Sequence, residues 1–449
     1  MNPELRRNLW LEFSLHRVIA APVVIALVMA LILASDSKNP LDSIASAAAY
    51  GFAVIVLLWG AKLAGASVID EARERTWDAQ RMSSITPWRM TWGKLLGAPS
   101  FAWYCGLILL LVFVVSGSQV QLPVARYAAL MVCGAILLHA MALNASVLAA
   151  RNGVANRSSG ILIIILLLFV LMTLRAFVPD DLQKSMAWWG ISLPRIDFML
   201  YTAVAFGAWA VLGAYRSMCD ELEIRTTPWA LPSFILFTAA YFAGFAMHGA
   251  TNEPSAFFGV MASSVIIAIV FVYALLLAEK SGASAWQRLR ARLQVQQVHR
   301  ALQELPLWLV ALGLGLLTAL ATTLASGGSE SGSRSDGLLH QVGLAPIALM
   351  LFAVRDAAIF QFFALARQPR RVTAATLFYL LLLYGLLPGL LKATGAAAIA
   401  QFVLPPLIER PAFTTVVMAV QAALAVALAY ARWRKIHAPD VHSQTVKSL

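Results

Sequence analysis

Apolar residues gather along this sequence into twelve long runs that are separated by short polar stretches. Most of the runs approach the roughly 20 residues that a helix needs to cross a bilayer. We therefore predict an all-α polytopic membrane protein with about twelve transmembrane helices. The runs lie at about 18–34, 43–61, 95–116, 126–149, 159–174, 197–215, 229–248, 256–279, 306–326, 341–364, 372–392 and 412–431.

A polar bridge that includes Asp220, Glu221 and Glu223 separates the first six runs from the last six. We therefore divide the chain into one six-span region at 1–216 and a second at 217–449. The connections are short, because 60% of the residues are hydrophobic and only 12% are charged, with a mean hydropathy of +0.75. This composition excludes a sizeable soluble domain.

The net charge of +12 comes from 34 Lys and Arg residues against 22 Asp and Glu residues. In a soluble protein this excess suggests nucleic acid, whereas basic residues in a membrane protein gather in cytoplasmic loops. An N-terminus inside the cell places 25 of the 34 basic residues on the inner side. We predict both termini inside, membrane lipid and no nucleic acid as partner, and a bacterial inner membrane as the location.

Neither metal binding nor enzymatic activity is indicated by the sequence. Cys105, Cys133 and Cys219 are far apart, and the seven histidines form no HExxH or other paired spacing. A membrane-embedded transferase needs a cluster of acidic residues or histidines at one membrane face, and no such cluster is found. We predict no metal site, no catalytic residue and no enzyme.

The connection between the second and third runs, residues 70–94, is long and charged. Strong helix formers and the i, i+4 pair Glu71 and Arg75 extend the second span into a charged helix that we expect to stop near Ser83. Thr86 as the N-cap and Pro87 as the first helical residue predict a new helix that leads into the third span. We name residues 70–94 the elbow.

Trp77 lies among the charged residues of this elbow. A large aromatic side chain is unfavourable in water and often anchors a partner protein, so Trp77 predicts a docking surface. The alternative is a solvated loop whose charges only enforce the topology.

The elbow resembles a segment of the type-2 class of ATP-binding-cassette (ABC) permeases. In that segment an acidic residue, a Gly-Thr pair, a proline and a terminal Gly-Lys recur. The matching positions are Glu71, Glu74, Thr76, Trp77, Asp78, Pro87, Gly93 and Lys94. Arg75 stands where that segment usually has a glycine before the threonine, so the resemblance does not determine the geometry of the turn.

This resemblance implies that the elbow is a coupling helix held in a cleft of a cytosolic ABC ATPase subunit. Glu71, Glu74, Thr76, Trp77, Asp78 and Pro87 would then be the coupling residues. A helix along the inner membrane surface is also implied ahead of the first span, where Asn2 can cap and Pro3 can start a helix.

A second, partly decayed copy is indicated by a recurring pattern. Arg73, Glu74 and Pro87 with Arg89 recur 282 residues later as Arg355, Asp356, Pro369 and Arg371. We interpret 288–432 as a degenerate repeat and 355–371 as a second, weaker coupling element; chance agreement is the alternative.

The chain lacks the GxxxxGK[ST] phosphate loop. No cofactor is expected on this chain, so ATP and Mg would be bound by the partner ATPase. The chain is predicted to be the permease subunit of an ATP-driven exporter. This subunit would pair with a second copy of itself or with a sister permease, unless the repeat supplies both contacts to the ATPase. The alternative is an ion-coupled secondary transporter with twelve spans.

The cargo is predicted only by class. Few ionisable residues fall within the runs, which favours a lipid-like or apolar cargo. His139 and Asn144 in the fourth run are the candidates for a substrate path.

Overall fold

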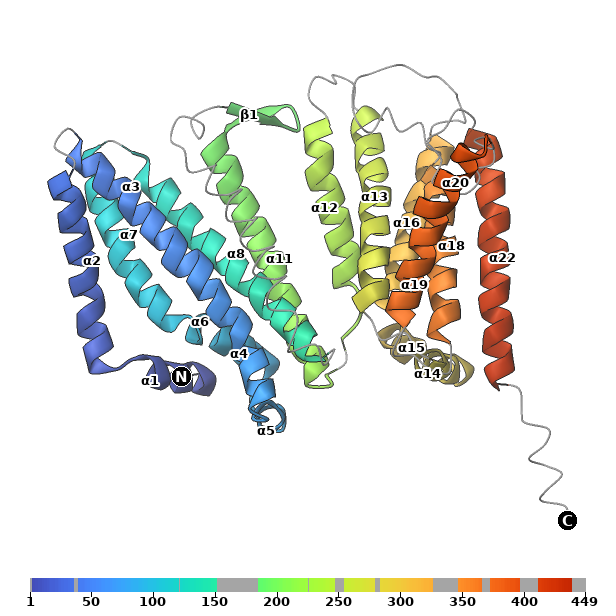
Figure 1. Ribbon diagram of the computed structural model, residues 1–449, viewed down its shortest axis with the longest axis horizontal. Coiled ribbons are helices and arrows are strands. Elements are labelled where there is room, and N and C mark those ends of the chain that lie inside the picture. The colour runs from blue at the N-terminus through green and yellow to red at the C-terminus, as the bar shows by residue number, and fades with distance from the viewer. Residues whose placement is uncertain are drawn as a thin grey trace, which may run out of the picture. The chain divides into compact units, whose positions relative to one another are not determined.

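The computed structural model describes residues 2–35, 39–120, 122–151, 185–224, 226–246, 254–278, 283–325, 346–365, 372–395 and 411–437. The chain is mostly helical (Figure 1) and divides into two compact units. The first unit comprises Met1–Ala187 and Ile191–Thr226, and the second comprises Trp188–Gly190 and Thr227–Leu449. The predicted boundary at 216 and 217 lies within ten residues of this division.

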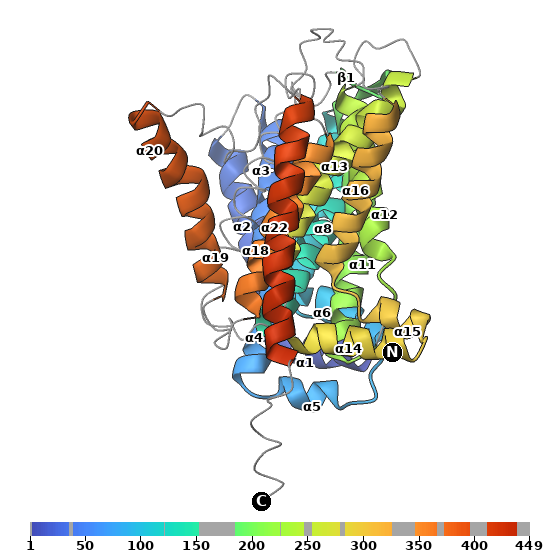
Figure 2. The same ribbon diagram turned by 90° about the vertical axis from the view of Figure 1, so that its right-hand side faces the viewer.

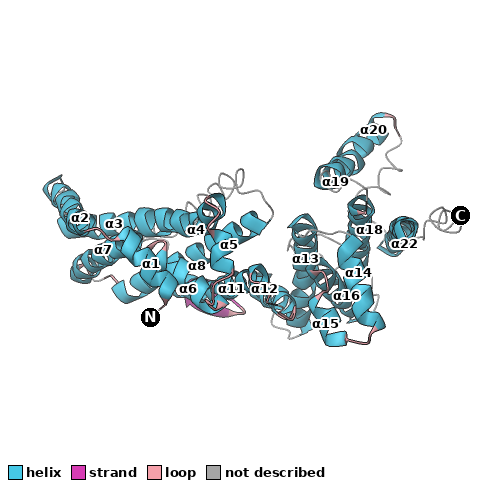
Figure 3. Cartoon of the chain, turned by 90° about the horizontal axis from the view of Figure 1, so that it is seen from below, coloured by secondary structure: helices cyan, strands magenta, loops and turns pink. Residues whose placement is uncertain are grey.

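The first unit begins with a short helix that lies across the ends of its upright helices (Figures 1 and 3). The second apolar run forms one long helix, α3–η1–α4, with a π-helical middle section. The elements are α1 (Pro3–Glu12), α2 (Leu15–Ser35), α3 (Pro40–Phe52), η1 (Ala53–Gly60), α4 (Ala61–Arg73), α5 (Trp77–Arg81), α6 (Pro87–Gly97), α7 (Ser100–Gln119), α8 (Val124–Arg151) and α11 (Arg195–Glu221).

The second unit is again a set of upright helices, with α14 and α15 lying across their ends (Figures 1 and 2). Its elements are α12 (Ala230–Ala246), α13 (Pro254–Ala278), α14 (Ala283–Gln294), α15 (Val298–Gln303), α16 (Leu307–Ala325), α18 (Pro346–Ala364), α19 (Val372–Leu381), η3 (Leu382–Leu386), α20 (Leu387–Ala393) and α22 (Pro411–His437). A short hairpin, β1 (Ser185–Trp188) and β2 (Ile191–Pro194), precedes α11, and the mostly helical fold agrees with the all-α prediction.

Eight of the described helices are long and apolar enough to cross a membrane, and three shorter ones are also apolar. The chain is therefore an integral membrane protein. All the predicted runs except 159–174 coincide with described helices; that run lies outside the described residues. The count of twelve spans and the position of both termini inside stay predictions.

Proline marks the beginning of many of these helices. Its fixed backbone angle suits the first turn of a helix, where its missing N–H group costs no hydrogen bond. The helices that begin with proline are α1, α3, α6, α13, α18 and α22.

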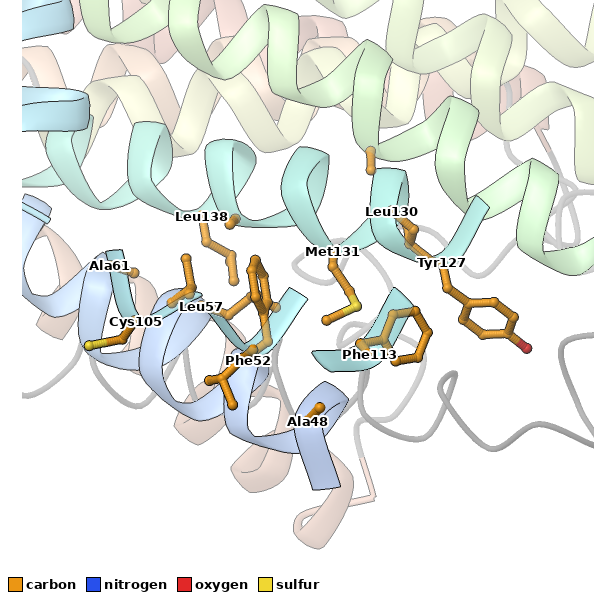
Figure 4. Packing of buried hydrophobic residues seen from close by; sticks show 14 of the residues in the cluster. Ala48, Phe52, Leu57, Ala61, Cys105, Phe113, Tyr127, Leu130, Met131 and Leu138 are labelled. Atoms are coloured by element: carbon orange, nitrogen blue, oxygen red, sulfur yellow. The ribbon is translucent and has the colours of Figure 1, made fainter. Parts of the chain in front are cut away.

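The core of the first unit lies where α3 and η1 meet α7 and α8 (Figure 4). Phe52, Met131 and Leu138 are buried there. In lipid, helices associate through close packing rather than through the hydrophobic effect. Gly106 of α7 provides such packing, because a Cβ atom at this position would lie 2.3 Å from Cγ2 of Val56.

The core of the second unit is formed by α12, α13, α16 and α18. Ile235, Val272, Trp308 and Met350 are buried in it, together with alanines that let the helices approach one another closely.

Candidate functional site

The second span ends ten residues earlier than the sequence predicts, because the chain turns at Arg75. Arg75 adopts a left-handed conformation with φ of 61°. Its N–H group donates to the carbonyl of Ala72 at 3.4 Å, and that of Thr76 donates to the carbonyl of Glu71 at 3.0 Å. This is a helix end of the Schellman type, in which glycine is the usual left-handed residue. Arg75 thus adopts the conformation that a glycine would favour there.

The remainder of the elbow follows the prediction. After α5, the side chain of Thr86 accepts a hydrogen bond from the N–H group of Arg89 at 3.5 Å, and Pro87 is the first residue of α6. The predicted N-cap and helix start are confirmed. The elbow therefore consists of the end of α4, the short α5 and the beginning of α6.

We expect Arg75→Gly to stabilise this turn. A left-handed residue other than glycine costs roughly 1–2 kcal/mol, part of which is offset by the greater freedom of glycine in the unfolded chain. Amide hydrogen exchange of residues 71–81 should slow several-fold. The control Arg73→Gly replaces the last residue of α4, a right-handed position where glycine relieves no strain and costs up to about 1 kcal/mol, and should speed exchange. Faster exchange in Arg75→Gly would contradict this account of the turn.

A buried ion cluster fastens the elbow to the spans. The side chain of Lys94 is 1% exposed, and its ammonium group binds the carboxylates of Glu71 and Glu4, the latter at 3.2 Å. The guanidinium of Arg7 donates to Glu71 at 2.6 Å, and the amide of Gln80 in α5 donates to Glu71 at 2.7 Å. Two cations thus balance two carboxylates, as buried charges require.

The same cluster docks α1 against α6. Gly93 leaves no room for a side chain, because its Cβ atom would lie 2.5 Å from Cβ of Glu4. Asn2 caps α1 by accepting from the N–H group of Glu4, and its own amide donates to the carbonyl of Arg89. The predicted helix start at Asn2 and Pro3 is confirmed, and the Gly93–Lys94 pair is a packing and ion-pairing feature.

The structure corrects the expectation that Trp77 is an exposed anchor. Its residue is only 6% exposed and packs with Val68, Leu143, Val147 and Met218. The ammonium group of Lys94 lies 5.3 Å from the centroid of its ring. Packing against α8 and α11 keeps Trp77 out of water. The residues near Trp77 in the sequence could not indicate these contacts. Its indole N–H has no partner among the described residues.

A cleft of about 550 Å³ opens beside Trp77, between the elbow and the end of α11. Its charged lining residues are Arg75, Asp78, Arg81, Asp220, Glu221 and Glu223. Arg81 lies 3.6 Å from the carboxylate of Asp78 and 3.9 Å from that of Glu223, and it donates to the carbonyl of Glu221 at 2.9 Å. Four carboxylates against two guanidinium groups make the lining acidic.

The predicted coupling residues therefore separate into two groups. Glu74, Thr76 and Asp78 are exposed, whereas Glu71 and Trp77 are buried and position the elbow. Sequence reasoning missed Glu4, Arg7 and Glu223 as members of the site. The charges of α1 and the polar bridge were visible, but nothing local indicated that they meet the elbow.

The proposed substrate-path residues, His139 and Asn144, form hydrogen bonds between helices. His139 is fully buried, and its Nε2 donates to the carbonyl of Val56 in η1 at 2.8 Å. This bond joins α8 to the π-helical section of the second helix. Asn144 accepts from the hydroxyl of Ser217 in α11. Both residues join helices to one another.

The expected second coupling element, residues 355–371, forms no elbow in its described part, residues 355–365. Arg355 and Asp356 lie inside α18, buried, with the guanidinium Nε 3.2 Å from Oδ1 of Asp356. The hydroxyls of Tyr273 and Tyr384 donate to the Asp356 carboxylate. The Arg355–Asp356 pair and the two tyrosines thus form a buried hydrogen-bond network within α18 and its neighbours. Pro369 and Arg371 lie outside the described residues.

Within the ranges that the structure describes, no group of three or more His, Cys, Asp and Glu residues could hold a metal ion. Comparisons of the chain with protein-family models, with curated proteins and with solved structures return no match.

Proposed function

We propose that this protein is the membrane-spanning permease subunit of an ATP-driven exporter of the type-2 ABC class. The observation that carries the proposal is the charged elbow that is joined rigidly to the spans. Glu71 and Lys94 tie its two arms together, and α1 clamps them. A force applied to α5 would therefore move α4 and α6 as one body.

The cleft supports a partner that carries basic side chains. Its acidic lining and the exposed Asp78 and Glu223 complement an Arg or Lys residue projecting from a cytosolic ATPase subunit. ATP and Mg would be held by that ATPase. The cargo of this exporter is lipid-like or apolar, and the membrane is the inner membrane of a bacterium.

The test combines Asp78→Lys with Glu223→Lys and measures binding to a phosphate-loop ATPase that is encoded beside this chain in its genome. Placing like charges in an interface costs several kcal/mol, so the dissociation constant should rise at least a hundredfold. Co-purification in detergent and microscale thermophoresis measure this change.

The matched control is Glu12→Lys with Asp42→Lys. These two residues lie on α1 and α3, outside the elbow and the cleft, and their replacement makes the same change in charge. The control should bind the ATPase within threefold of the unaltered protein. Equal binding by the cleft variant and the unaltered protein would contradict the proposed function.

The alternative, an ion-coupled secondary transporter, is favoured by one observation, which is the buried Arg355–Asp356 pair in α18. The pair is already satisfied by Tyr273, Tyr384 and Gln421, which leaves no ligand position for an ion. Transport by vesicles that lack ATP but carry an ion gradient would establish this alternative.

A further inference from the structure

The second unit has a turn of the same kind as the elbow, at the junction of α14 and α15. Gln296 adopts a left-handed conformation with φ of 55°. Its N–H group donates to the carbonyl of Leu293 at 3.1 Å, and that of Gln297 donates to the carbonyl of Arg292 at 3.1 Å. These bonds have the same spacing as those at Arg75 and Thr76. A short helix follows in both units.

A single offset of 221 residues relates the two turns. It pairs the last helical residues Arg73 and Gln294, the left-handed Arg75 and Gln296, and Trp77 and Val298, which begin α5 and α15. A proline also begins or immediately precedes the next helix in each unit, at Pro87 and Pro306, which are 219 residues apart.

The same offset brings two of the longer helices of each unit into correspondence. It places α8 over α18, and α11 over most of α22. The packing is also shared, because α8 packs along α11 and α18 packs along α22. Likewise α3 packs on α2 and α7, as α13 packs on α12 and α16. The two units thus repeat one architecture.

No residue is identical between 70–81 and 291–302 at this offset. The repeat is therefore carried by the path of the backbone and not by side chains. The sequence pattern at an offset of 282 instead pairs the end of α4 with the interior of α18.

The second turn is also fastened to its own spans. The rings of Trp286 and Trp308 meet edge to face at 6.2 Å, and the indole of Trp286 donates to Gln361 of α18 at 3.3 Å. The guanidinium of Arg290 lies 5.5 Å from the ring centroid of Trp433 at the end of α22. A force on α14 and α15 would reach α16, α18 and α22.

We propose that residues 283–303 form a second elbow that docks a second ATPase subunit, so that one chain supplies both contacts of an ATPase pair. This inference rests on the proposed function. The second elbow exposes Val295 and Val298 at 66% and 61%, beside the exposed guanidinium groups of Arg290 and Arg300; that of Arg288 is paired with Glu304. It therefore fits an acidic groove with an apolar floor, whereas the cleft at the first elbow fits a basic side chain.

The experiment measures the stoichiometry of the complex by native mass spectrometry, with every phosphate-loop ATPase that is found encoded beside this chain co-expressed, because the two elbows differ in charge. We expect one permease chain with two ATPase chains. Val298→Asp with Arg300→Glu should leave one ATPase chain bound. Asp78→Lys with Glu223→Lys should likewise leave one, and the four changes together should leave none.

The control is Arg434→Glu with Lys435→Glu, an even larger change of charge at the end of α22, and it should keep both ATPase chains. Purified alone in detergent, the protein should have the mass of one chain. Two permease chains in the complex, or a dimer when the protein is purified alone, would overturn the inference and leave the proposed function standing.

Two further outcomes are distinguishable. If no ATPase binds the unaltered chain, the proposed function and the inference fall together. If the Val298→Asp and Arg300→Glu variant keeps both ATPase chains but loses co-purified phosphatidylglycerol, the second elbow is a lipid-binding surface and the inference is overturned.

Discussion

Replacing Lys94 with methionine should release α1 and the elbow from the first unit. Lys94 is buried with the carboxylates of Glu4 and Glu71, and without it those carboxylates keep only the half-exposed Arg7 as a cation. Breaking a buried ion pair by removing one partner costs about 3–5 kcal/mol. Amide hydrogen exchange of 3–12 and 71–81 should therefore speed by roughly two to three orders of magnitude.

Two further variants decide whether charge is the cause. Lys62→Met removes an exposed lysine from α4, and its effect should stay within about 0.5 kcal/mol. Adding Glu4→Gln and Glu71→Gln to Lys94→Met removes the uncompensated charges and should restore much of the lost stability. A triple variant that exchanges as fast as Lys94→Met would show that packing, and not charge, holds α1.

Replacing Asp356 with alanine should destabilise the second unit to a similar degree. The guanidinium of Arg355 is buried in α18 and would keep only Gln421 and Tyr384 as hydrogen-bond partners. An uncompensated buried charge costs about 3–5 kcal/mol. Exchange should rise in 346–364 and in 411–437, which pack together, while residues 40–73 of the first unit should be unaffected.

The double variant Arg355→Met with Asp356→Leu is the matched test. It removes both charges and keeps apolar volume in the span, a change that is often neutral or stabilising. Its exchange should be closer to that of the unaltered protein than to that of Asp356→Ala. An equal increase in the exchange rate in the single and double variants would mean that the shape of Asp356, and not its charge, stabilises the second unit.

Local patterns predicted most of the helices. Apolar runs gave the spans, and the capping residues Asn2 and Thr86 with the prolines beside them gave exact helix starts. These signals are readable because they act over a few residues. The turn at Arg75 could not be predicted from the sequence, because arginine seldom adopts the left-handed conformation.

Contacts between distant residues could not be predicted in this way. Lys94 meets Glu4 across 90 positions, and Arg81 meets Glu221 across 140. These contacts bury Trp77 and form the cleft. The residue pattern at an offset of 282 pairs the end of α4 with the interior of α18, whereas the backbone of the two turns matches at an offset of 221.

If both elbows dock ATPase subunits, as we propose, carrying them on one polypeptide lets each of them mutate separately. In a homodimer every substitution appears twice, and both docking surfaces must tolerate it at once. Here Asp78 and its counterpart His299 could acquire opposite character through independent genetic drift. Such a chain can come to recognise two unlike ATPases, which a symmetric assembly of identical subunits could not do.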